Sequence, residues 1–213
     1  MLTQLYHLSI FVLFSKVVFM SQKKKILRIL EEHGLVTTKM VTENGLSRRI
    51  LSQLEDQKLI SRIERGIYAM NSECVDRYFL LQYRFPQGVF SHETALHLLD
   101  HLDQEPQQLH MTFPVGFNSL RAKNAEIQPI ISKDVTVGIR PVSRSGGTTI
   151  HVYEIERTLL DLLKPKYTAD KEQFFAALKH YLCSDQKDIP KLLNYARLFN
   201  LESKIQPYLE VLL

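Results

Sequence analysis

The sequence predicts an α+β protein in which an N-terminal winged helix-turn-helix is followed by a mixed α/β domain. Three observations predict this fold class. Positive charge gathers in residues 21–70, the same segment carries helical patterns separated by an Asn-Gly turn, and two short strand patterns follow those helices directly. We therefore expect an apolar leader over residues 1–20, a DNA-binding domain over residues 21–70 and a second domain over residues 71–213.

The net charge of +4 over 213 residues is concentrated in one segment. Residues 21–70 contain ten Lys/Arg against six Asp/Glu, a difference of +4, and residues 1–20 add one lysine. Residues 71–150 contain seven against eight, and residues 151–213 nine against nine. A basic head on a neutral body is typical of a protein that meets a polyanion with one small surface.

The remaining composition indicates a packed protein of the cytoplasm. Hydrophobic residues make up 45% of the chain, which is enough for a core and argues against disorder. The two cysteines, Cys74 and Cys183, lie far apart and belong to no CxxC or Cys/His pattern. We therefore expect neither a disulfide framework nor a structural zinc site, no cofactor, and a reducing, cytoplasmic location.

The apolar leader, residues 1–20, leaves three interpretations open. It has no basic residue before Lys16 and no small-residue cleavage pattern, so it fits a signal peptide poorly. Polar residues interrupt the run of about twenty apolar residues that a membrane helix needs, although the lysines at 23–25 would suit a membrane anchor. The other two interpretations are an extra packing helix and a natural start at Met20. We favour the start at Met20 and expect no membrane association.

The first helices of the winged helix-turn-helix are predicted from apolar spacing and capping residues. Apolar residues recur at helical spacing after Lys23, and Gly34 stands where such a helix would end. Thr37 or Thr38 can cap a short second helix that contains Met40.

A third helix follows a tight turn at Asn44-Gly45; we expect Ser47 to cap it and Lys58 to lie near its end. At about 100° per residue its apolar residues gather on one side. The polar residues of its first turns project from the other side and are of the types that reach phosphates and base edges in a DNA major groove. These residues are Ser47, Arg48, Arg49, Ser52 and Gln53.

A β-wing is predicted immediately after this helix, because apolar and polar residues alternate over residues 60–65 before Gly66. Arg62 and Arg65 would lie on the wing, where they can neutralise backbone phosphates. Thr38 and Lys39 would meet the DNA backbone from the second helix. The alternative is a small helical bundle with a solvated basic face, but the wing and the concentration of charge favour DNA binding.

Residues 71–213 predict a body of helices and strands. Helices are expected at residues 74–84, 91–99, 154–163 and 170–182, and as a final pair that starts at Pro190. Strands are expected at residues 88–90, 109–113, 135–142 and 148–153, the last two joined by a turn at residues 145–147.

The body contains residue types found in active sites, but their spacing does not predict catalysis. His97 and His101 would share a helix face, yet the glutamate of a zinc-protease pattern is missing and no third ligand is evident. Residues 91–93 read Ser-His-Glu, but consecutive residues are not expected to converge as nucleophile, base and orienting group. A cap followed by an acidic helix turn explains them better.

Two further patterns also favour a structural role over a catalytic one. Residues 146–147 lack the frame of a phosphate loop, and the Glu-Ser-Lys at residues 202–204 lacks the preceding strand aspartate of a nuclease. Arg157 and Asp161 are i, i+4 partners, for which we expect a helix-face ion pair of a few tenths of a kcal/mol, or an organising pair of the body if both are buried. We therefore expect a binding protein rather than an enzyme.

Four segments resemble sequence blocks of the AbiEi antitoxin family, in the order and spacing of that family. The wing segment, residues 63–68, has the form IxRGxY. The body contains FSHETALHLLD at residues 90–100, LHMTFPVGFN at residues 109–118 and VYEIERTLLDLL at residues 152–163. These three are similar to the family's SHETAL, T-x-P-x-G-[YF] and ERTxxD blocks, so the resemblance runs from about Lys23 to the C-terminus.

The resemblance implies the antitoxin of an AbiE-type, type IV toxin–antitoxin system that acts in phage resistance by abortive infection. Its winged helix would bind inverted repeats in double-stranded promoter DNA and repress its own operon. Residues 71–213 would form the antitoxin domain, which would oppose an AbiEii-like nucleotidyltransferase toxin without a stable complex. The alternative is a winged-helix transcriptional regulator whose C-terminal domain binds a small effector, with residues 114–118 as a candidate ligand loop.

Overall fold

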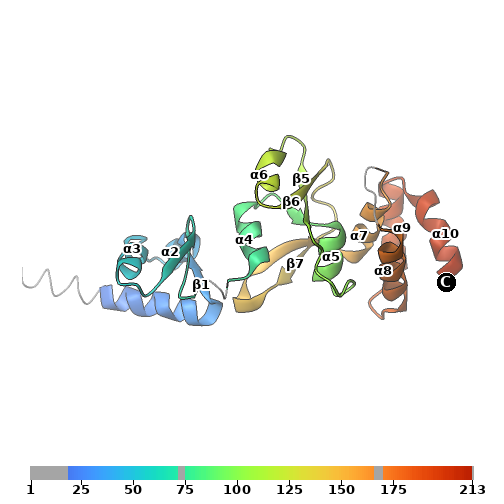
Figure 1. Ribbon diagram of the computed structural model, residues 1–213. Helices are drawn as coiled ribbons and strands as arrows, with labels where there is room; N and C mark the ends of the chain where they lie inside the picture. Colours follow the sequence, from blue (N-terminus) through green and yellow to red (C-terminus); the bar gives the residue numbers. More distant parts are fainter. Residues whose placement is uncertain (1–18, 72–74, 166–169, 213) are drawn as a thin grey trace, which may run out of the picture. The chain divides into compact units, whose positions relative to one another are not determined.

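The computed structural model describes residues 19–71, 75–165 and 170–212 (Figure 1). The fold is α+β, as predicted, and its contacts divide it into two compact units. The first unit extends to Leu80 and also includes Ser143–Thr149; the second comprises Leu81–Val142 and Ile150–Leu213. Apart from its last two residues, the apolar leader lies outside the described residues. No helix in the described ranges combines the length and the apolar character needed to cross a membrane.

The first unit begins with a helix over residues 19–33, drawn in blue in Figure 1. Gly34 ends this helix with φ of +70°, and its N–H donates to the Leu30 carbonyl at 2.8 Å. Helix α2 (Thr38–Glu43) is capped by Thr37, whose hydroxyl accepts a hydrogen bond from the Met40 N–H at 3.1 Å. Both features agree with the sequence prediction.

A three-stranded antiparallel sheet of order β1-β3-β2 completes the winged helix-turn-helix. Strands β2 (Ser61–Glu64) and β3 (Ile67–Ala69) form the predicted wing, and Gly66 turns between them with φ of +86°. Strand β1 (Leu35–Thr37) pairs with β3 and was not expected, because three residues are too few to show an alternating pattern. The core of the unit is apolar: Ile26, Leu30, Val36, Val41, Leu46, Ile50, Leu51, Leu54, Ile60 and Tyr68.

Helix α3 (Arg49–Asp56) is shorter than predicted at its C-terminal end. At its start, Ser47 has the predicted capping role: Arg48 already has helical φ and ψ of −60° and −24°, and Ser47 Oγ accepts a hydrogen bond from the Arg49 N–H at 3.3 Å. The helix ends before Lys58, whose φ is +57°. The Lys58 N–H donates to the Glu55 carbonyl and the Leu59 N–H to the Leu54 carbonyl, which is the hydrogen-bond pattern of a Schellman cap.

The first unit also contains a turn from much later in the sequence, Ser143–Thr149. Arg144 Nε lies 2.7 Å from Asp76 Oδ2, and its guanidinium lies 5.0 Å from the centre of the Tyr78 ring. The Gly146 carbonyl lies 2.7 Å from Nδ1 of His33. A Cβ atom at Gly146 would come within 2.0 Å of the His33 carbonyl oxygen, so only glycine fits there. The sequence prediction placed this turn in the domain of residues 71–213.

The second unit is built on a five-stranded mixed sheet of order β6-β5-β4-β8-β7. Strand β4 pairs antiparallel with β5 and parallel with β8, and β5 pairs parallel with β6. The strands are β4 (Val89–Phe90), β5 (Leu109–Pro114), β6 (Ile127–Ser132), β7 (Ile139–Ser143) and β8 (Thr149–Tyr153).

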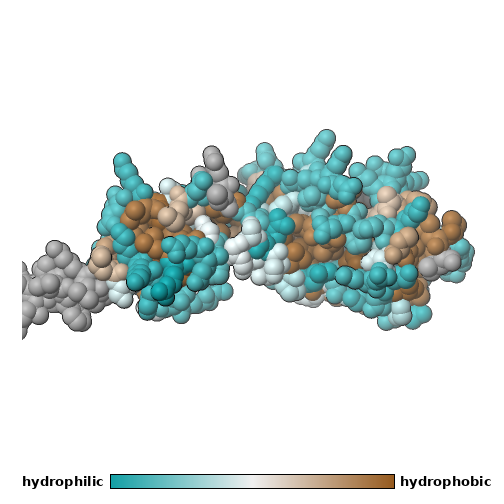
Figure 2. All heavy atoms as spheres, turned by 90° about the horizontal axis from the view of Figure 1, so that it is seen from below, coloured by the Kyte–Doolittle hydropathy of each residue, from teal (hydrophilic) through white to brown (hydrophobic). Residues whose placement is uncertain are grey.

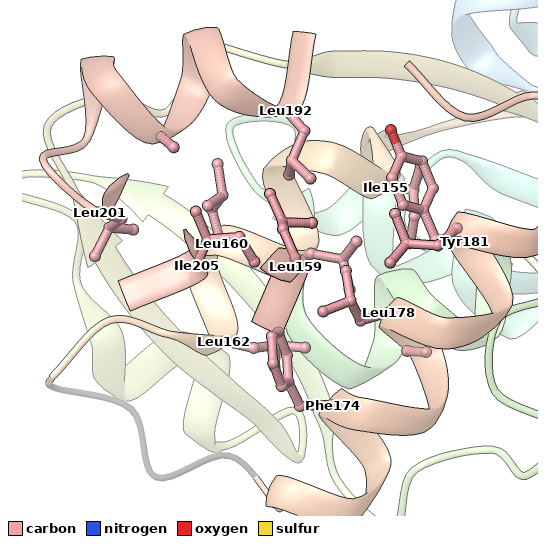
Figure 3. Packing of buried hydrophobic residues seen from close by; sticks show 14 of the residues in the cluster. Ile155, Leu159, Leu160, Leu162, Phe174, Leu178, Tyr181, Leu192, Leu201 and Ile205 are labelled. Atoms are coloured by element: carbon pink, nitrogen blue, oxygen red, sulfur yellow. The ribbon is translucent and has the colours of Figure 1, made fainter. Parts of the chain in front are cut away.

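The last four helices of the chain pack into one apolar core (Figure 3). Leu159, Leu160, Leu178 and Leu192 are fully buried in it. The helices are α4 (Arg77–Arg84), α5 (His92–Leu98), α6 (Ser119–Lys123), α7 (Ile155–Leu162), α8 (Lys171–Cys183), α9 (Ile189–Leu198) and α10 (Glu202–Leu212). One face of the molecule shows mostly hydrophilic residues with smaller hydrophobic patches between them (Figure 2).

Several element bounds differ from those predicted for residues 71–213. Residues 135–138 form a turn with Gly138 at φ of +71°, so the strand expected at residues 135–142 starts at Ile139. Helix α4 starts after Asp76, whose carboxylate accepts a hydrogen bond from the Tyr78 N–H at 2.7 Å; the expected start at Cys74 lies outside the described residues. Helix α6 and strand β6 were not expected, and the proline in β6 masked its strand pattern.

Candidate nucleic-acid interface

The structure places the predicted DNA-contacting residues on α2, on the turn before α3, on the first turns of α3 and on the wing. Thr38 is half-buried, and the other eight are exposed: Lys39, Ser47, Arg48, Arg49, Ser52, Gln53, Arg62 and Arg65. On the opposite side of α3, Ile50, Leu51 and Leu54 are 1%, 1% and 0% exposed. The helix therefore holds its polar side toward solvent by burying its apolar side, as the spacing predicted.

Helix α2 is attached to both neighbouring parts of the interface. The Thr38 N–H donates to the Gly66 carbonyl at 2.9 Å, which ties the start of α2 to the turn of the wing. At its other end, Thr42 Oγ1 accepts a hydrogen bond from Arg48 Nε at 3.2 Å. These contacts bring α2, the N-terminus of α3 and the wing turn into one surface.

The two arginines of the wing differ in their position and in their hydrogen bonds. Arg62 lies on β2 opposite Tyr68, and its Nε donates to the Glu64 carbonyl at 3.3 Å across a bulge in the strand. Arg65 precedes Gly66 in the turn and is exposed. A protruding turn with an exposed guanidinium is suited to contact with a phosphate.

The first helix also carries exposed basic residues, which were not predicted as part of the interface. Lys23 Nζ donates to Gln57 Oε1 at 3.1 Å, which joins that helix to the residue after α3. Lys24, Lys25 and Arg28 are exposed on the same helix. The run of lysines at residues 23–25 was the available signal: it contributes to the charge of residues 21–70 and would suit a membrane anchor, but it predicted no individual interface residue.

In the second unit, two sequence blocks of the body, residues 90–100 and 109–118, meet in polar contacts of the interior. Thr112 Oγ1 donates to Ser91 Oγ at 2.9 Å, and the His110 N–H donates to Thr94 Oγ1 at 2.8 Å. Ser91 Oγ also lies 3.0 Å from His92 Nδ1. Two of the three residues at 91–93 therefore meet, whereas Glu93 lies beside His110, with its Oε2 3.4 Å from His110 Nδ1.

The contact between Ser91 and His92 depends on an unusual backbone conformation. His92 has a φ of +54°, which turns its ring back toward the preceding residue. Ser91 and His92 are 0% and 2% exposed, so neither side chain faces solvent. The expected cap role of Ser91 is also only partly met, because its hydroxyl makes no capping hydrogen bond. The pair organises the interior rather than presenting a nucleophile.

Burial lowers the pKa of His92 to about 3, so its imidazole is neutral in the folded protein. The unfolded chain regains the ordinary pKa of 6.5 and takes up a proton as the pH falls below that value. The associated stability is present above pH 6.5 and is lost toward pH 3. We expect His92 alone to reduce the free energy of unfolding by about 2 kcal/mol between pH 7 and pH 5.

Urea unfolding at pH 7 and pH 5 tests this expectation. The control variant is His92→Asn, because asparagine tolerates positive φ and does not titrate in this range. Wild-type protein should lose about 2 kcal/mol more than the variant on acidification. Equal losses in the two proteins would show that His92 does not carry the pH dependence.

Arg157 and Asp161 form the predicted i, i+4 pair, but both side chains are buried, at 0% and 2% exposed. Arg157 Nε lies 2.9 Å from Asp161 Oδ2, and its Nη1 donates to the Asp134 carbonyl at 3.2 Å. The guanidinium lies 4.6 Å from the centre of the Tyr153 ring and 4.1 Å from that of Phe199. Burial makes this an organising pair of the body and not a surface pair of a few tenths of a kcal/mol.

His97 and His101 do not share a helix face, because α5 ends at Leu98. His97 Nδ1 lies 3.1 Å from the Leu102 carbonyl, whereas His101 Nδ1 lies 3.0 Å from Nδ1 of His180. The described ranges contain no group of three or more His, Cys, Asp or Glu residues that could hold a metal ion.

The candidate ligand loop, residues 114–118, is a turn closed by an aromatic contact. Phe117 stacks on Phe113 with ring centres 3.9 Å apart, and Gly116 turns the chain with φ of +88°. A polar cavity of about 200 Å³ lies elsewhere in the second unit. Its lining includes His101, Arg140, Glu154, Glu156, Tyr181 and Lys191.

Comparisons with known proteins give one family match, which lies in the first unit, and a similar solved structure. Residues 24–71 match a family model described as "Transcriptional regulator, AbiEi antitoxin". No curated protein matches the sequence. The chain is similar to the crystal structure of the RV2827C protein from Mycobacterium tuberculosis, with a TM-score of 0.47 and 15% sequence identity over 84% of this chain and 70% of that chain.

Proposed function

We propose that this chain, whose residues 24–71 match the AbiEi antitoxin family of transcriptional regulators, represses its own operon and opposes the toxin encoded with it. The observation that carries the proposal is the division of α3 into a buried apolar side and an exposed side with Arg48, Arg49, Ser52 and Gln53. Such a helix, next to a wing, can enter a DNA major groove while the wing rests on the backbone.

The interface residues have distinct roles in this proposal. Side chains at the start of α3 read or anchor in the groove of double-stranded promoter DNA, and Thr38 and Lys39 of α2 contact its backbone. Arg62 and Arg65 hold the wing on the flanking phosphates. Inverted repeats in the promoter would accommodate two copies of the chain on one DNA site. The groove-facing residues are Ser47, Arg48, Arg49, Ser52 and Gln53.

The second part of the proposal assigns antitoxin activity to residues 71–213. This domain opposes an AbiEii-like nucleotidyltransferase toxin without a stable complex, as in a type IV system of phage resistance by abortive infection. The protein works in the cytoplasm, not at a membrane, and it needs no catalytic step, cofactor or metal ion. The neutral charge of this domain supports a division of labour in which the basic segment, residues 21–70, binds the DNA.

Growth rescue separates the two activities. We expect cells that express the toxin to grow when they also express the full chain with Arg49→Ala and Arg65→Ala, because the variant retains the whole antitoxin domain. We also expect residues 71–213 alone to rescue growth at least partly, and residues 21–70 alone not to. Colony counts on inducing plates measure the effect, and rescue by residues 21–70 alone would contradict the division of labour.

The polar cavity of about 200 Å³ favours a second candidate, a winged-helix regulator whose C-terminal domain binds a small effector. The neighbouring gene discriminates between the two. A nucleotidyltransferase reading frame directly downstream supports the antitoxin, whereas its absence together with a metabolic operon supports the effector-binding regulator.

A further inference from the structure

Thr42 of α2 links the two helices of the helix-turn-helix through two hydrogen bonds. Its hydroxyl donates to the Thr38 carbonyl one turn earlier at 2.8 Å. The same oxygen accepts a hydrogen bond from Arg48 Nε at 3.2 Å. Because a hydroxyl has one hydrogen to donate, the bond to Thr38 leaves the Thr42 oxygen as an acceptor toward Arg48.

This link orients the guanidinium of Arg48. The group is planar and carries its five N–H donors in a fixed arrangement, so fixing the direction of Nε–H constrains the edge formed by the two Nη atoms. That edge points away from Thr42 and offers two parallel donors. Arg48 is exposed at the N-cap of α3, the end of the helix that enters the groove in this fold.

Among the described residues, no such hydrogen bond orients the guanidinium of the neighbouring Arg49. Arg49 is also exposed, but within the ranges that the structure describes its side chain has no hydrogen bond or ion pair. A mobile arginine can follow a phosphate, which accepts hydrogen bonds from many directions. A paired contact to O6 and N7 of guanine instead needs two donors held in one plane, and a side chain already oriented loses less entropy on binding.

We propose that Thr42 is a positioning residue for DNA recognition: it holds Arg48 so that Arg48 makes a base contact that discriminates between sequences. This inference rests on the proposed function, since it assumes that α3 enters the major groove. Arg49 then contributes charge on the phosphates, and Arg48 contributes preference for the operator. The hydrogen bond between Thr42 and Arg48 therefore contributes more to the affinity for promoter DNA than to the affinity for unrelated DNA.

Fluorescence anisotropy with two labelled duplexes tests the inference on the full chain. One duplex carries the protein's own promoter, and the other is a scrambled sequence of the same length and composition. Thr42→Val keeps the branched shape and removes the hydroxyl, whereas Thr42→Ser restores the hydroxyl. We expect Thr42→Val to weaken promoter binding about fivefold, as for the cost of ordering one long side chain on binding, and Thr42→Ser to bind like wild type.

Four further readouts separate positioning from a structural role. Thr42→Val should change binding to the scrambled duplex less than twofold and leave the salt slope unchanged, whereas Arg49→Ala should reduce the slope by about one. In an Arg48→Ala background, Thr42→Val should have no further effect on promoter binding. The thermal midpoints of Thr42→Val and Thr42→Ser should coincide.

The outcomes distinguish the inference from the function on which it rests. If wild-type protein fails to prefer its promoter over the scrambled duplex, the proposed function is wrong. If wild type prefers its promoter and Thr42→Val binds it equally well, only the positioning role of Thr42 is wrong. An equal loss on both duplexes, or a full effect of Thr42→Val in the Arg48→Ala background, would also overturn it.

Discussion

Replacing Arg49 and Arg65 together with alanine is expected to abolish retardation of promoter DNA in a gel shift. Arg49 lies on the exposed side of α3 and Arg65 in the turn of the wing, so the double variant loses a charge from each part of the interface. Each charge-assisted hydrogen bond to a phosphate contributes about 1.5–3 kcal/mol. Two of them correspond to a loss of about a hundredfold or more in affinity.

The control variant removes two positive charges outside the predicted interface. Lys171 and Lys179 are exposed on α8, in the second unit, and Lys171→Ala with Lys179→Ala lowers the net charge equally. This control should shift promoter DNA like wild type. Circular dichroism should show the same helical content and thermal midpoint for all three proteins. Unchanged promoter affinity in the Arg49 and Arg65 variant would refute the assignment of the interface.

Replacing Arg157 with alanine is expected to lower the free energy of unfolding of the second unit by about 3–5 kcal/mol. The substitution leaves the Asp161 carboxylate, which is 2% exposed, without its closest buried partner. Lys164 Nζ lies 2.6 Å from Asp161 Oδ1 and compensates only one of its oxygens. The substitution also removes the guanidinium between the rings of Tyr153 and Phe199.

A double variant and a surface pair serve as controls. Arg157→Met with Asp161→Leu removes both charges and keeps most of the volume, so it should recover a large part of the lost stability. Arg197→Ala breaks an exposed pair with Glu202, 67% and 54% exposed, and should change stability by less than about 1 kcal/mol. Urea denaturation followed by circular dichroism measures all four proteins. A double variant less stable than Arg157→Ala would contradict the argument from an uncompensated charge.

The DNA-binding unit could be predicted from the sequence because its signals are local. The apolar spacing of α3, the cap at Thr37 and the glycine turns at Gly34 and Gly66 each depend on a few neighbouring residues. The cap of α3 is a local signal too: Ser47 was predicted from its position before the helix, and its hydroxyl accepts a hydrogen bond from the Arg49 N–H.

Features that depend on distant residues could not be predicted in this way. Strand β1 is three residues long and is defined by its pairing with β3. The positive φ of His92 and the burial of Arg157 follow from packing against other segments of the body. The spacing i, i+4 predicted the pair of Arg157 with Asp161, but burial, which determines its energetic contribution, required the structure.

The hydrogen bond between Thr42 and Arg48 is another feature of the interface that could not be predicted from the sequence. The sequence marks Arg48 as a residue facing DNA, but it gives no reason to associate a threonine six positions earlier with it. The hydrogen bond arises because the turn at Asn44-Gly45 brings the end of α2 back to the start of α3.

A footprint of the wild-type protein on its own promoter tests the central claim most directly. We expect protection of an inverted repeat at nanomolar protein in about 0.1 M salt, with affinity falling steeply as salt rises. The Arg49→Ala and Arg65→Ala variant should leave the same DNA unprotected. An unprotected promoter with about 1 µM wild-type protein, a concentration well above specific dissociation constants, would contradict the assignment of this chain as a DNA-binding repressor of its own operon.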